Sequence, residues 1–236
     1  MCVSFLLATL LCVVCEATQT EVKVFIIAGQ SNAEGQAEVE TRNKTTGEFL
    51  NGTLAYQTLV NQTTAPLFAP LWDEARNNWT ILPSVAMWYN ENGTQSGVNG
   101  STIPSQPGDA CFGKLSVGFG SNCNANLFGP ELGFGFALEA ALNEKFLIMK
   151  TAWGGKTLAG DFRPPSSTKG PDVFCQGTCD PSIVGHYYQV MVSDAQKMLK
   201  PGAVSAMFPD LAGLTPRIAG FGWFQGERES ARTLTL

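Results

Sequence analysis

The sequence predicts an α/β fold in which helices cover a parallel β-sheet. Three observations predict it. A β-branched apolar run, Val22–Ala28, ends in Gly29, and two segments with helical spacing, Pro130–Asn143 and Tyr187–Leu199, alternate with further apolar runs. Such alternation of strands and helices is typical of parallel sheets. With 236 residues, of which 44% are hydrophobic, the chain suffices for one domain with a sizeable core.

Three strands are predicted. Val22–Ala28 has the pattern of a central strand that is buried on both faces, because it is a nearly continuous apolar run. Phe146–Thr151 gives the second strand and Ile218–Phe224 the third. The third strand lies at an edge of such a sheet and is apolar, which makes it an aggregation hazard unless another strand covers it.

Two helices are predicted between these strands. Pro130 and Glu131 suit the first turn of a helix that ends near Asn143, because proline fits that turn and a carboxylate complements the helix dipole. The inner face of this helix is expected to hold Leu132, Phe136, Ala140 and Leu142. The second helix ends at Pro201-Gly202 and repeats core residues at helical spacing, namely Tyr187, Val190, Met191, Ala195 and Met198.

Residues 36–128 are predicted to form a long insertion. The segment is rich in Asn, Gly, Thr and Pro and contains short strand-like pieces at Val85–Tyr89 and Leu115–Phe119. Six N-glycosylation sequons indicate that part of it is exposed and carries N-glycans, at Asn43, Asn51, Asn61, Asn78, Asn92 and Asn99.

The first 17 residues are predicted to be a secretory signal peptide. An apolar run, Val3–Val14, is followed by small residues around Cys15 and Ala17, where cleavage is expected. The run is shorter than the roughly 20 residues that span a bilayer. We therefore expect a secreted or lumenal protein without stable membrane insertion, whose residues 18–236 form one domain. A buried first strand or helix is the alternative interpretation of this run.

Four cysteines would remain after removal of residues 1–17, an even number that suits disulfides in an oxidising compartment. Of the three possible pairings, Cys111 with Cys123 and Cys175 with Cys179 are favoured because local closure costs the least loop entropy. The spacing of these cysteines does not match a zinc site, so no metal is expected.

Charge and motifs argue against several other classes of protein. The net charge is −5 and there is no basic stripe, so a nucleic-acid partner is not expected. Neither Gly-x-Gly-x-x-Gly nor the Walker pattern occurs, and no cofactor is expected. Glu131 and Asp161 could be nominated as the carboxylate pair of a glycosidase, but their spacing does not single them out.

Ser31 is the candidate nucleophile. It lies in Gly29-Gln30-Ser31-Asn32-Ala33-Glu34-Gly35, directly after the first strand. The carboxyl ends of parallel strands carry active sites, and a hydroxyl in a glycine-bounded turn is exposed beside N–H groups that can bind an oxyanion. A serine that only caps a helix is the alternative.

Four motifs occur in one order along the chain: Gly29-Gln30-Ser31-Asn32 with Gly35; Phe128-Gly129-Pro130-Glu131; Lys150-Thr151-Ala152-Trp153-Gly154-Gly155-Lys156 with Asp161-Phe162-Arg163-Pro164-Pro165; and Trp223-Phe224-Gln225-Gly226-Glu227. In this order they resemble the SGNH/GDSL-like hydrolases, and among these the sialate O-acetylesterase and acetylxylan-esterase branch. The resemblance spans roughly residues 22–230. It implies a three-layer α/β/α, flavodoxin-like fold and a secreted serine esterase that removes acetyl groups from carbohydrates.

The resemblance also assigns roles to single residues. Ser31 would attack the acyl carbonyl, and its own N–H would act with the N–H of Gly154 and the amide of Gln225 as the oxyanion hole. Glu227 would hold its loop in place. The alternative interpretation is that Gln225 and Glu227 are ordinary polar residues that follow a strand. The residues implied on the substrate side are Asn32, Trp153 and Glu227.

One block of the family pattern is absent. The Asp-x-x-His motif, in which His takes the serine proton and Asp fixes its tautomer, does not occur, so the base His and Asp are missing. The single histidine, His186, lies outside every motif. Since a serine without a base is a weak nucleophile, weak or absent turnover is expected. The chain is interpreted as a truncated esterase that lacks the C-terminal part of its fold.

Two other functions remain open. A non-catalytic glycan-binding relative would use the same pocket, with Trp153 and Trp223 stacking on a sugar and the amides of Asn32 and Gln225 donating hydrogen bonds. A structural secreted glycoprotein would be supported only by the sequons and the disulfides.

Overall fold

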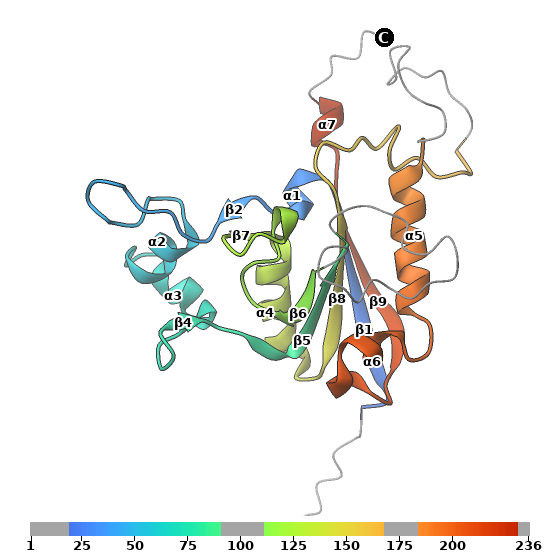
Figure 1. The fold of residues 1–236 in the computed structure, drawn as a ribbon, viewed down its shortest axis with the longest axis horizontal. Coiled ribbons are helices and arrows are strands. Elements are labelled where there is room, and N and C mark those ends of the chain that lie inside the picture. The colour runs from blue at the N-terminus through green and yellow to red at the C-terminus, as the bar shows by residue number, and fades with distance from the viewer. Residues whose placement is uncertain (1–18, 91–110, 168–183, 231–236) are drawn as a thin grey trace, which may run out of the picture.

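The computed structural model describes residues 19–90, 111–167 and 184–230. In these residues five strands form the main sheet in the order β6-β5-β8-β1-β9 (Figure 1). The strands are β1 (Glu21–Gly29), β5 (Leu82–Tyr89), β6 (Cys111–Leu115), β8 (Phe146–Ala152) and β9 (Thr215–Phe224). All neighbours pair in parallel except β5 and β6, which are antiparallel. The predicted α/β class is confirmed.

Helices lie on both faces of this sheet, which gives three layers (Figure 1). α4 (Pro130–Leu142) covers one face, where Phe136 and Leu142 pack against the cluster that includes Ile27 and Ile148. α5 (His186–Met198) and α6 (Ala203–Met207) cover the other face, where Met198 and Val204 join Ile26 in a second cluster. The strand residues alternate between the two clusters, as a strand buried on both faces requires.

Shorter elements connect and extend these layers. Beside the sheet lie the antiparallel strand pair β2–β7, the hairpin β3–β4 and the short helices α2 and α3 (Figure 1). Their bounds are α1 (Ser31–Glu34), β2 (Ala37–Glu38), α2 (Leu54–Leu59), α3 (Ala65–Phe68), η1 (Ala69–Leu71), β3 (Trp72–Asp73), β4 (Asn78–Trp79), η2 (Ser121–Cys123), β7 (Leu127–Phe128), η4 (Pro209–Leu211) and α7 (Glu227–Ser230).

The prediction of three strands is wrong, because β5 and β6 also belong to the main sheet. The sequence pattern does predict a strand-like piece at Val85–Tyr89, but the surrounding segment 36–128 is rich in Asn, Gly, Thr and Pro, which favours an insertion over a strand of the main sheet. The predicted piece Leu115–Phe119 is displaced, since β6 ends at Leu115. On α4, Ala140 is exposed rather than on the inner face, where Glu131 and Gly135 are buried instead.

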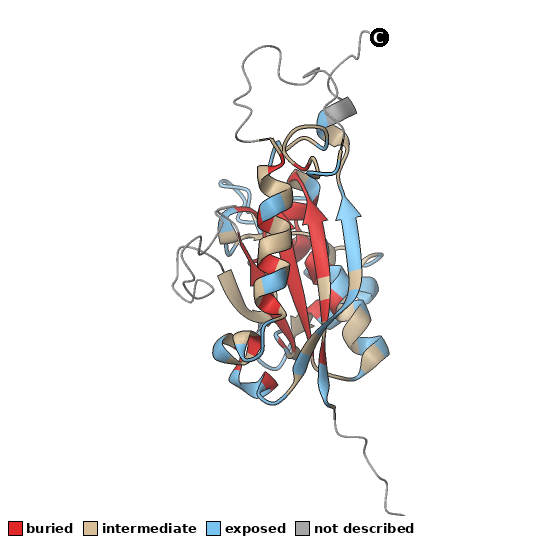
Figure 2. Ribbon diagram, turned by 90° about the vertical axis from the view of Figure 1, so that its right-hand side faces the viewer, coloured by how far each residue is buried: buried red, intermediate tan, exposed pale blue. Residues whose placement is uncertain are grey.

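The two strands beside β1 differ sharply in burial. Every residue of β8 is buried, whereas most of β9 is exposed (Figure 2). β9 therefore forms an edge strand of the sheet in the described residues, as predicted, with its exposed apolar side chains at Ile218, Phe221, Trp223 and Phe224.

The predicted disulfide between Cys111 and Cys123 is confirmed, with a Cα–Cα distance of 6.1 Å. The other predicted pair, Cys175 and Cys179, lies outside the described residues, as do the signal segment 1–17 and the sequons at Asn92 and Asn99. Among the remaining sequons Asn61 is partly buried and the others are exposed, at Asn43, Asn51 and Asn78. No helix in the described ranges is long and apolar enough to cross a membrane.

Candidate active site

Ser31 is the first residue of α1, the single helical turn that follows β1. Its side chain is partly exposed. The turn is closed by two backbone bonds, from the N–H of Glu34 to the carbonyl of Gln30 at 2.7 Å and from the N–H of Gly35 to the carbonyl of Ser31 at 3.0 Å. Because β1 runs between β8 and β9, the ends of all three strands meet at this turn (Figure 1).

Two glycines allow the turn to form. Gly29 has a φ of 151°, and a Cβ at this position would lie 1.9 Å from the carbonyl oxygen of Phe224. Gly35 has a φ of 93°, and its Cβ would lie 2.4 Å from the Cα of Gly129. Any other residue at either position would therefore force the backbone apart. The glycines that bound Ser31 serve close chain packing as well as a tight turn.

The loop after β8 lies against the nucleophile turn. The N–H of Trp153 donates to the carbonyl of Gly29 at 3.2 Å. Gly154, the predicted second oxyanion donor, is exposed, and a Cβ there would lie 2.8 Å from Oε2 of Glu34. The carboxylate of Glu34, which extends from α1, therefore lies beside the backbone of Gly154.

The segment after β9 reaches the same place from the other side. Nε2 of Gln225 donates to the carbonyl of Lys156 at 2.8 Å, which links the third predicted oxyanion donor to the loop that holds Gly154. Oε2 of Glu227 accepts from Nε2 of Gln30 at 2.8 Å, and Oε1 accepts from the amide of Asn32. Glu227 therefore binds both neighbours of Ser31.

The hydrogen bonds to Glu227 also affect its ionisation. Partial burial raises the pKa of this carboxyl, but the backbone N–H of Glu227 and the amides of Gln30 and Asn32 outweigh it, so the net pKa lies below its ordinary value. Glu227 is consequently ionised at neutral pH and acts as an acceptor for the turn. This contact supports the predicted role of Glu227 in holding its loop in place.

The two predicted tryptophans lie differently. Trp153 is only 4% exposed; its Nε1–H donates to the carbonyl of Asn90, and its ring packs against Phe162 and Tyr187. Trp223 is 39% exposed and contacts Phe162 edge-on. A sugar can thus reach Trp223 more readily than Trp153, whose contact with substrate stays a prediction.

The single histidine belongs to a different layer. His186 is the first residue of α5, and its ring meets that of Tyr187 edge-to-face. Tyr187 in turn packs against Trp153, the residue before Gly154. His186 is therefore on the helix that covers the sheet and not in the motifs that surround Ser31.

A groove of about 570 Å³ lies beside Ser31. Asn32 and Gly35 of the nucleophile turn line it together with Phe224 at the end of β9. The remaining lining comes from β2, β7 and the start of α4, at Gln36, Ala37, Phe128, Gly129, Pro130 and Gly133. It combines apolar surfaces with two side-chain amides, a composition that suits a small polar ring.

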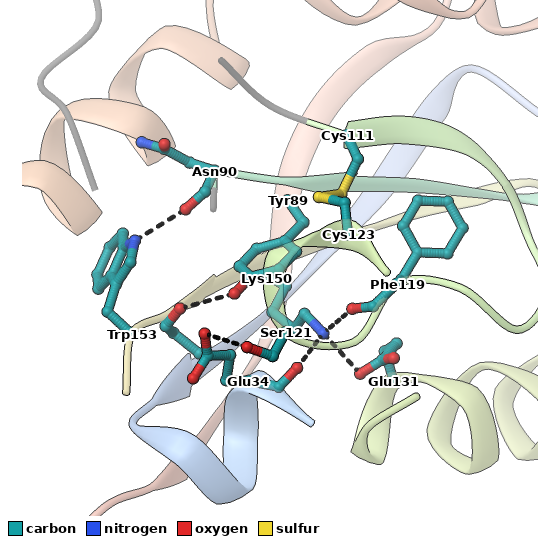
Figure 3. Close-up of a disulfide and its surroundings, with 11 residues drawn as sticks. Glu34, Tyr89, Asn90, Cys111, Phe119, Ser121, Cys123, Glu131, Lys150 and Trp153 are labelled. Carbon is teal, nitrogen blue, oxygen red and sulfur yellow. Dashed lines mark hydrogen bonds and ion pairs between the residues drawn. A yellow bond between two sulfur atoms is a disulfide. The ribbon is translucent and has the colours of Figure 1, made fainter. Parts of the chain in front are cut away.

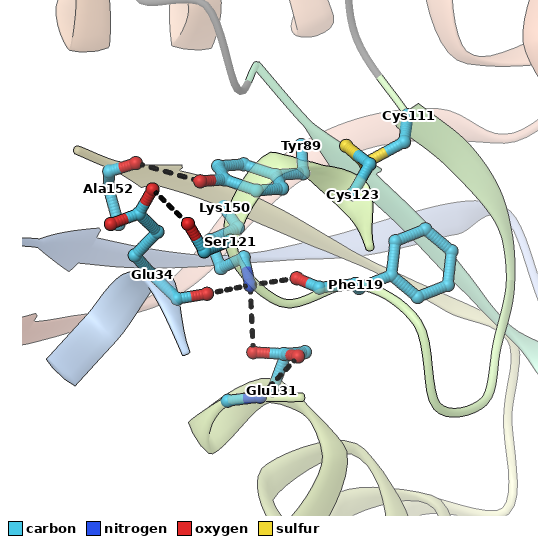
Figure 4. A network of polar contacts seen from close by, with 10 residues as sticks. Glu34, Tyr89, Cys111, Phe119, Ser121, Cys123, Glu131, Lys150 and Ala152 are labelled. Atoms are coloured by element: carbon cyan, nitrogen blue, oxygen red, sulfur yellow. Dashed lines mark hydrogen bonds and ion pairs between the residues drawn. A yellow bond between two sulfur atoms is a disulfide. The ribbon is translucent and has the colours of Figure 1, made fainter. Parts of the chain in front are cut away.

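Sequence reasoning missed a buried polar network below the turn (Figures 3 and 4). Lys150 of β8 is fully buried, and its Nζ donates to the carbonyl of Glu34 at 2.7 Å, to the carbonyl of Phe119 and to Oε2 of Glu131 at 3.0 Å. The same ammonium lies 4.4 Å from the centre of the Tyr89 ring. Four separate segments of the chain therefore converge on this lysine.

Burial dominates the ionisation of this pair. It raises the pKa of Glu131 and lowers the pKa of Lys150, and in each case the charge of the partner opposes the shift. The signal in the sequence was a lysine within the apolar run of the second strand, since a buried charge needs a partner. None of the roles that the sequence suggests for Glu131, in the helix dipole, a carboxylate pair or a family motif, includes this ion pair.

No group of three or more His, Cys, Asp or Glu side chains within the described ranges is arranged to hold a metal ion.

Comparisons with known proteins add the following findings. A family model described as "Carbohydrate esterase, sialic acid-specific acetylesterase" matches residues 21–235. Among solved structures, the chain is similar to a protein from Arabidopsis thaliana determined by X-ray analysis at 1.6 Å resolution, with 15% identity and a TM-score of 0.40. The match covers 88% of this chain and 58% of the Arabidopsis chain. No curated protein matches.

Proposed function

Since this chain belongs to the sialic acid-specific acetylesterases, a family of carbohydrate esterases, we propose that it is a secreted serine esterase that removes O-acetyl groups from carbohydrates. The observation that supports this most strongly is the convergence on the Ser31 turn of two other motif segments. The loop at Gly154 contacts Glu34, and the segment after β9 binds Gln30 and Asn32 through Glu227.

In the proposed reaction the Oγ of Ser31 attacks the carbonyl carbon of the acetyl ester. The negative charge that develops on the carbonyl oxygen is stabilised by the N–H groups of Ser31 and Gly154 and by the amide of Gln225. The bond to the sugar oxygen then breaks, the sugar leaves with the proton, and water hydrolyses the acetyl-serine. Each oxyanion donor is worth roughly 3 to 4 kcal/mol in enzymes where one has been removed.

None of the motifs supplies a base that would accept the proton of Ser31. The sequence has no Asp-x-x-His, and His186 lies on α5. We therefore expect slow hydrolysis, supported by the oxyanion hole rather than by a complete triad.

A second candidate function is glycan binding without hydrolysis, and two exposed aromatic side chains of β9 favour it. Trp223 and Phe221 stack with their ring centres 6.0 Å apart on the exposed side of β9, close to Gln225. Exposed aromatic rings of this kind bind the apolar faces of sugars. Retained binding of an acetylated glycan without acetate release, lost in Trp223→Ala, would support this candidate over the esterase.

The direct test is release of acetate from O-acetylated sialic acid and from acetylated xylan. Ser31→Ala should reduce acetate release to the uncatalysed background with both substrates, because it removes the attacking oxygen. Ser205→Ala is the matched control, since Ser205 lies on α6 and its hydroxyl donates locally, to the carbonyl of Gly202. Equal activity of Ser31→Ala and the wild type would refute the proposed nucleophile.

We propose that the sugar part of the substrate lies in the groove beside Ser31. A Cβ built at Gly133 has no neighbour within 4 Å, so a large side chain there can enter the groove without disturbing the fold. Gly133→Trp should raise KM for acetylated glycans and leave hydrolysis of p-nitrophenyl acetate unchanged, while Gly133→Ala should leave both unchanged. An unaltered KM for glycans in Gly133→Trp would place the sugar elsewhere.

A further inference from the structure

The carbonyl of Glu34 connects the buried network to the nucleophile. Glu34 is the last residue of α1, and its N–H closes the turn that begins at Gln30 and contains Ser31. The Nζ of Lys150 binds this carbonyl from below, at 2.7 Å. Lys150 therefore holds the far end of the one helical turn whose first residue is Ser31 (Figure 4).

The other partners of Lys150 fix where that turn sits. Oε2 of Glu131 binds the ammonium, and Oε1 accepts from the N–H of Gly129, whose Cα abuts Gly35. The carbonyl of Phe119 binds the same ammonium. α1 is thereby positioned against the start of α4 and against the loop before η2.

Ser121, the first residue of η2, adds two further contacts. The N–H of Ser121 donates to the carbonyl of Gly35 at 2.7 Å, and its hydroxyl donates to Oε1 of Glu34 at 3.0 Å. The other carboxylate oxygen of Glu34 faces Gly154. The network thus reaches the Ser31 turn and the loop of the second oxyanion donor through one residue, Glu34 (Figure 3).

A purely structural explanation accounts for this network less well. A buried ion pair is seldom more stabilising than apolar side chains of similar volume, so stability alone gives little reason for a charge inside β8. Multiple directional bonds from one ammonium do fix the relative position of the segments they join. Reactions at a serine depend on such positioning, since a displacement of about 1 Å can cost a hundredfold in rate.

We propose that Lys150, together with Glu131, is a positioning element that sets the Ser31 turn relative to the Gly154 loop. The proposal deepens the proposed function and rests on Ser31 as its nucleophile. Lys150 acts through the backbone of Glu34 and does not touch the substrate.

The test separates positioning from stability with a double variant. Lys150→Met alone strands the Glu131 carboxylate and is expected to destabilise the fold. Lys150→Met with Glu131→Gln removes both charges and keeps an acceptor for Gly129, so its Tm should return toward the wild-type value. Lys23→Met is the matched control, because Lys23 pairs with Glu144 at the opposite end of the sheet.

Two readouts follow the turn itself. Amide hydrogen exchange of a peptide spanning residues 29–36 should be at least about tenfold faster in the double variant than in the wild type and unchanged in Lys23→Met. The rate of covalent labelling of Ser31 by a fluorophosphonate probe should fall about ten- to hundredfold in the double variant, with the Tm restored.

The outcomes separate the two proposals. Faster exchange at 29–36 with a restored Tm supports the positioning role even if Ser31 reacts with no probe, in which case only the proposed nucleophile fails. Wild-type exchange and wild-type labelling in the double variant would overturn the positioning role and leave the proposed function intact. Exchange that rises only in proportion to a lowered Tm would also overturn it.

Discussion

β8 and β9 lie on either side of β1 but hold it in different ways. β8 is buried along its whole length between α4 and α5, whereas β9 exposes most of its residues (Figure 2). Both strands pair with β1 in parallel over nearly its full length. Backbone pairing is therefore similar on the two sides, and the difference lies in what surrounds each strand.

The contacts of the Ser31 turn differ in burial between the β8 side and the β9 side. On the β8 side it is held by a buried lysine whose contacts are shielded from water. On the β9 side it is held by Glu227, whose contacts with Gln30 and Asn32 are near the surface. Hydrogen bonds to charged groups are stronger when desolvated. We therefore expect the contacts on the β8 side to contribute more to the free energy of unfolding than those on the β9 side.

The largest expected effect comes from stranding the buried lysine. Glu131→Leu leaves the charge of Lys150 without its carboxylate and should cost about 3–5 kcal/mol of unfolding free energy. Urea denaturation measures this, with Glu144→Leu as the control, because that carboxylate pairs with a partly exposed lysine. Equal losses in the two variants would contradict the asymmetry.

Breaking the disulfide should have the next largest effect. Cys111–Cys123 joins β6 to η2, next to Ser121, which binds Glu34. Replacing both cysteines by alanine should lower the unfolding free energy by roughly 2–4 kcal/mol. The Tm of this variant should match the Tm of the wild type in reductant. A Tm equal to that of the oxidised wild type would show that the disulfide does not stabilise the fold.

On the β9 side, Glu227→Gln should have a smaller effect, roughly 1 kcal/mol or less, because the site is near the surface. The effect should depend on pH. Since the pKa of Glu227 is lowered in the fold, its contribution is present above the ordinary value of 4.5 and is lost as the pH falls through the lowered pKa. The Tm difference between wild type and variant should therefore shrink from about pH 7 to about pH 3; a constant difference would rule out this carboxylate as the ionised acceptor.

The smallest effect on folding is expected on the open face of β9. Phe221 is 53% exposed, so Phe221→Thr should change the unfolding free energy by less than about 0.5 kcal/mol. It should reduce self-association, since an apolar edge strand pairs with other chains. Sedimentation velocity measures this, and Ile81→Thr, at an exposed site outside β9, should leave association unchanged. An equal reduction in both variants would mean that the edge is not the contact.

The parts of the fold that could be predicted from the sequence are those with a strong local pattern. The apolar runs of β1, β8 and β9 and the helical spacing of α4 and α5 each mark one element within a residue or two at most ends. β5 was identified only as a strand-like piece, because its place in the sheet depends on pairing with β8 some sixty residues later. Such long-range pairing leaves no local signal.

In the candidate site, too, some residues could be predicted from the sequence and others could not. Ser31 is predicted from its place in the turn after the first strand, and Gly154, Gln225 and Glu227 from the resemblance; the structure brings the segments of these residues together. The pairing of Lys150 with Glu131 was not found, because it joins a strand to the first turn of a helix across the core. Burial reveals its role, and burial is a property of the whole fold.

The measurement that tests the central claim most directly is the mass of the protein after reaction with a fluorophosphonate probe. The account predicts a single covalent adduct, located by peptide mapping at Ser31 of the turn after β1 and absent from Ser31→Ala. An adduct at another residue, or an adduct that persists in Ser31→Ala, would contradict the assignment of Ser31 as the nucleophile.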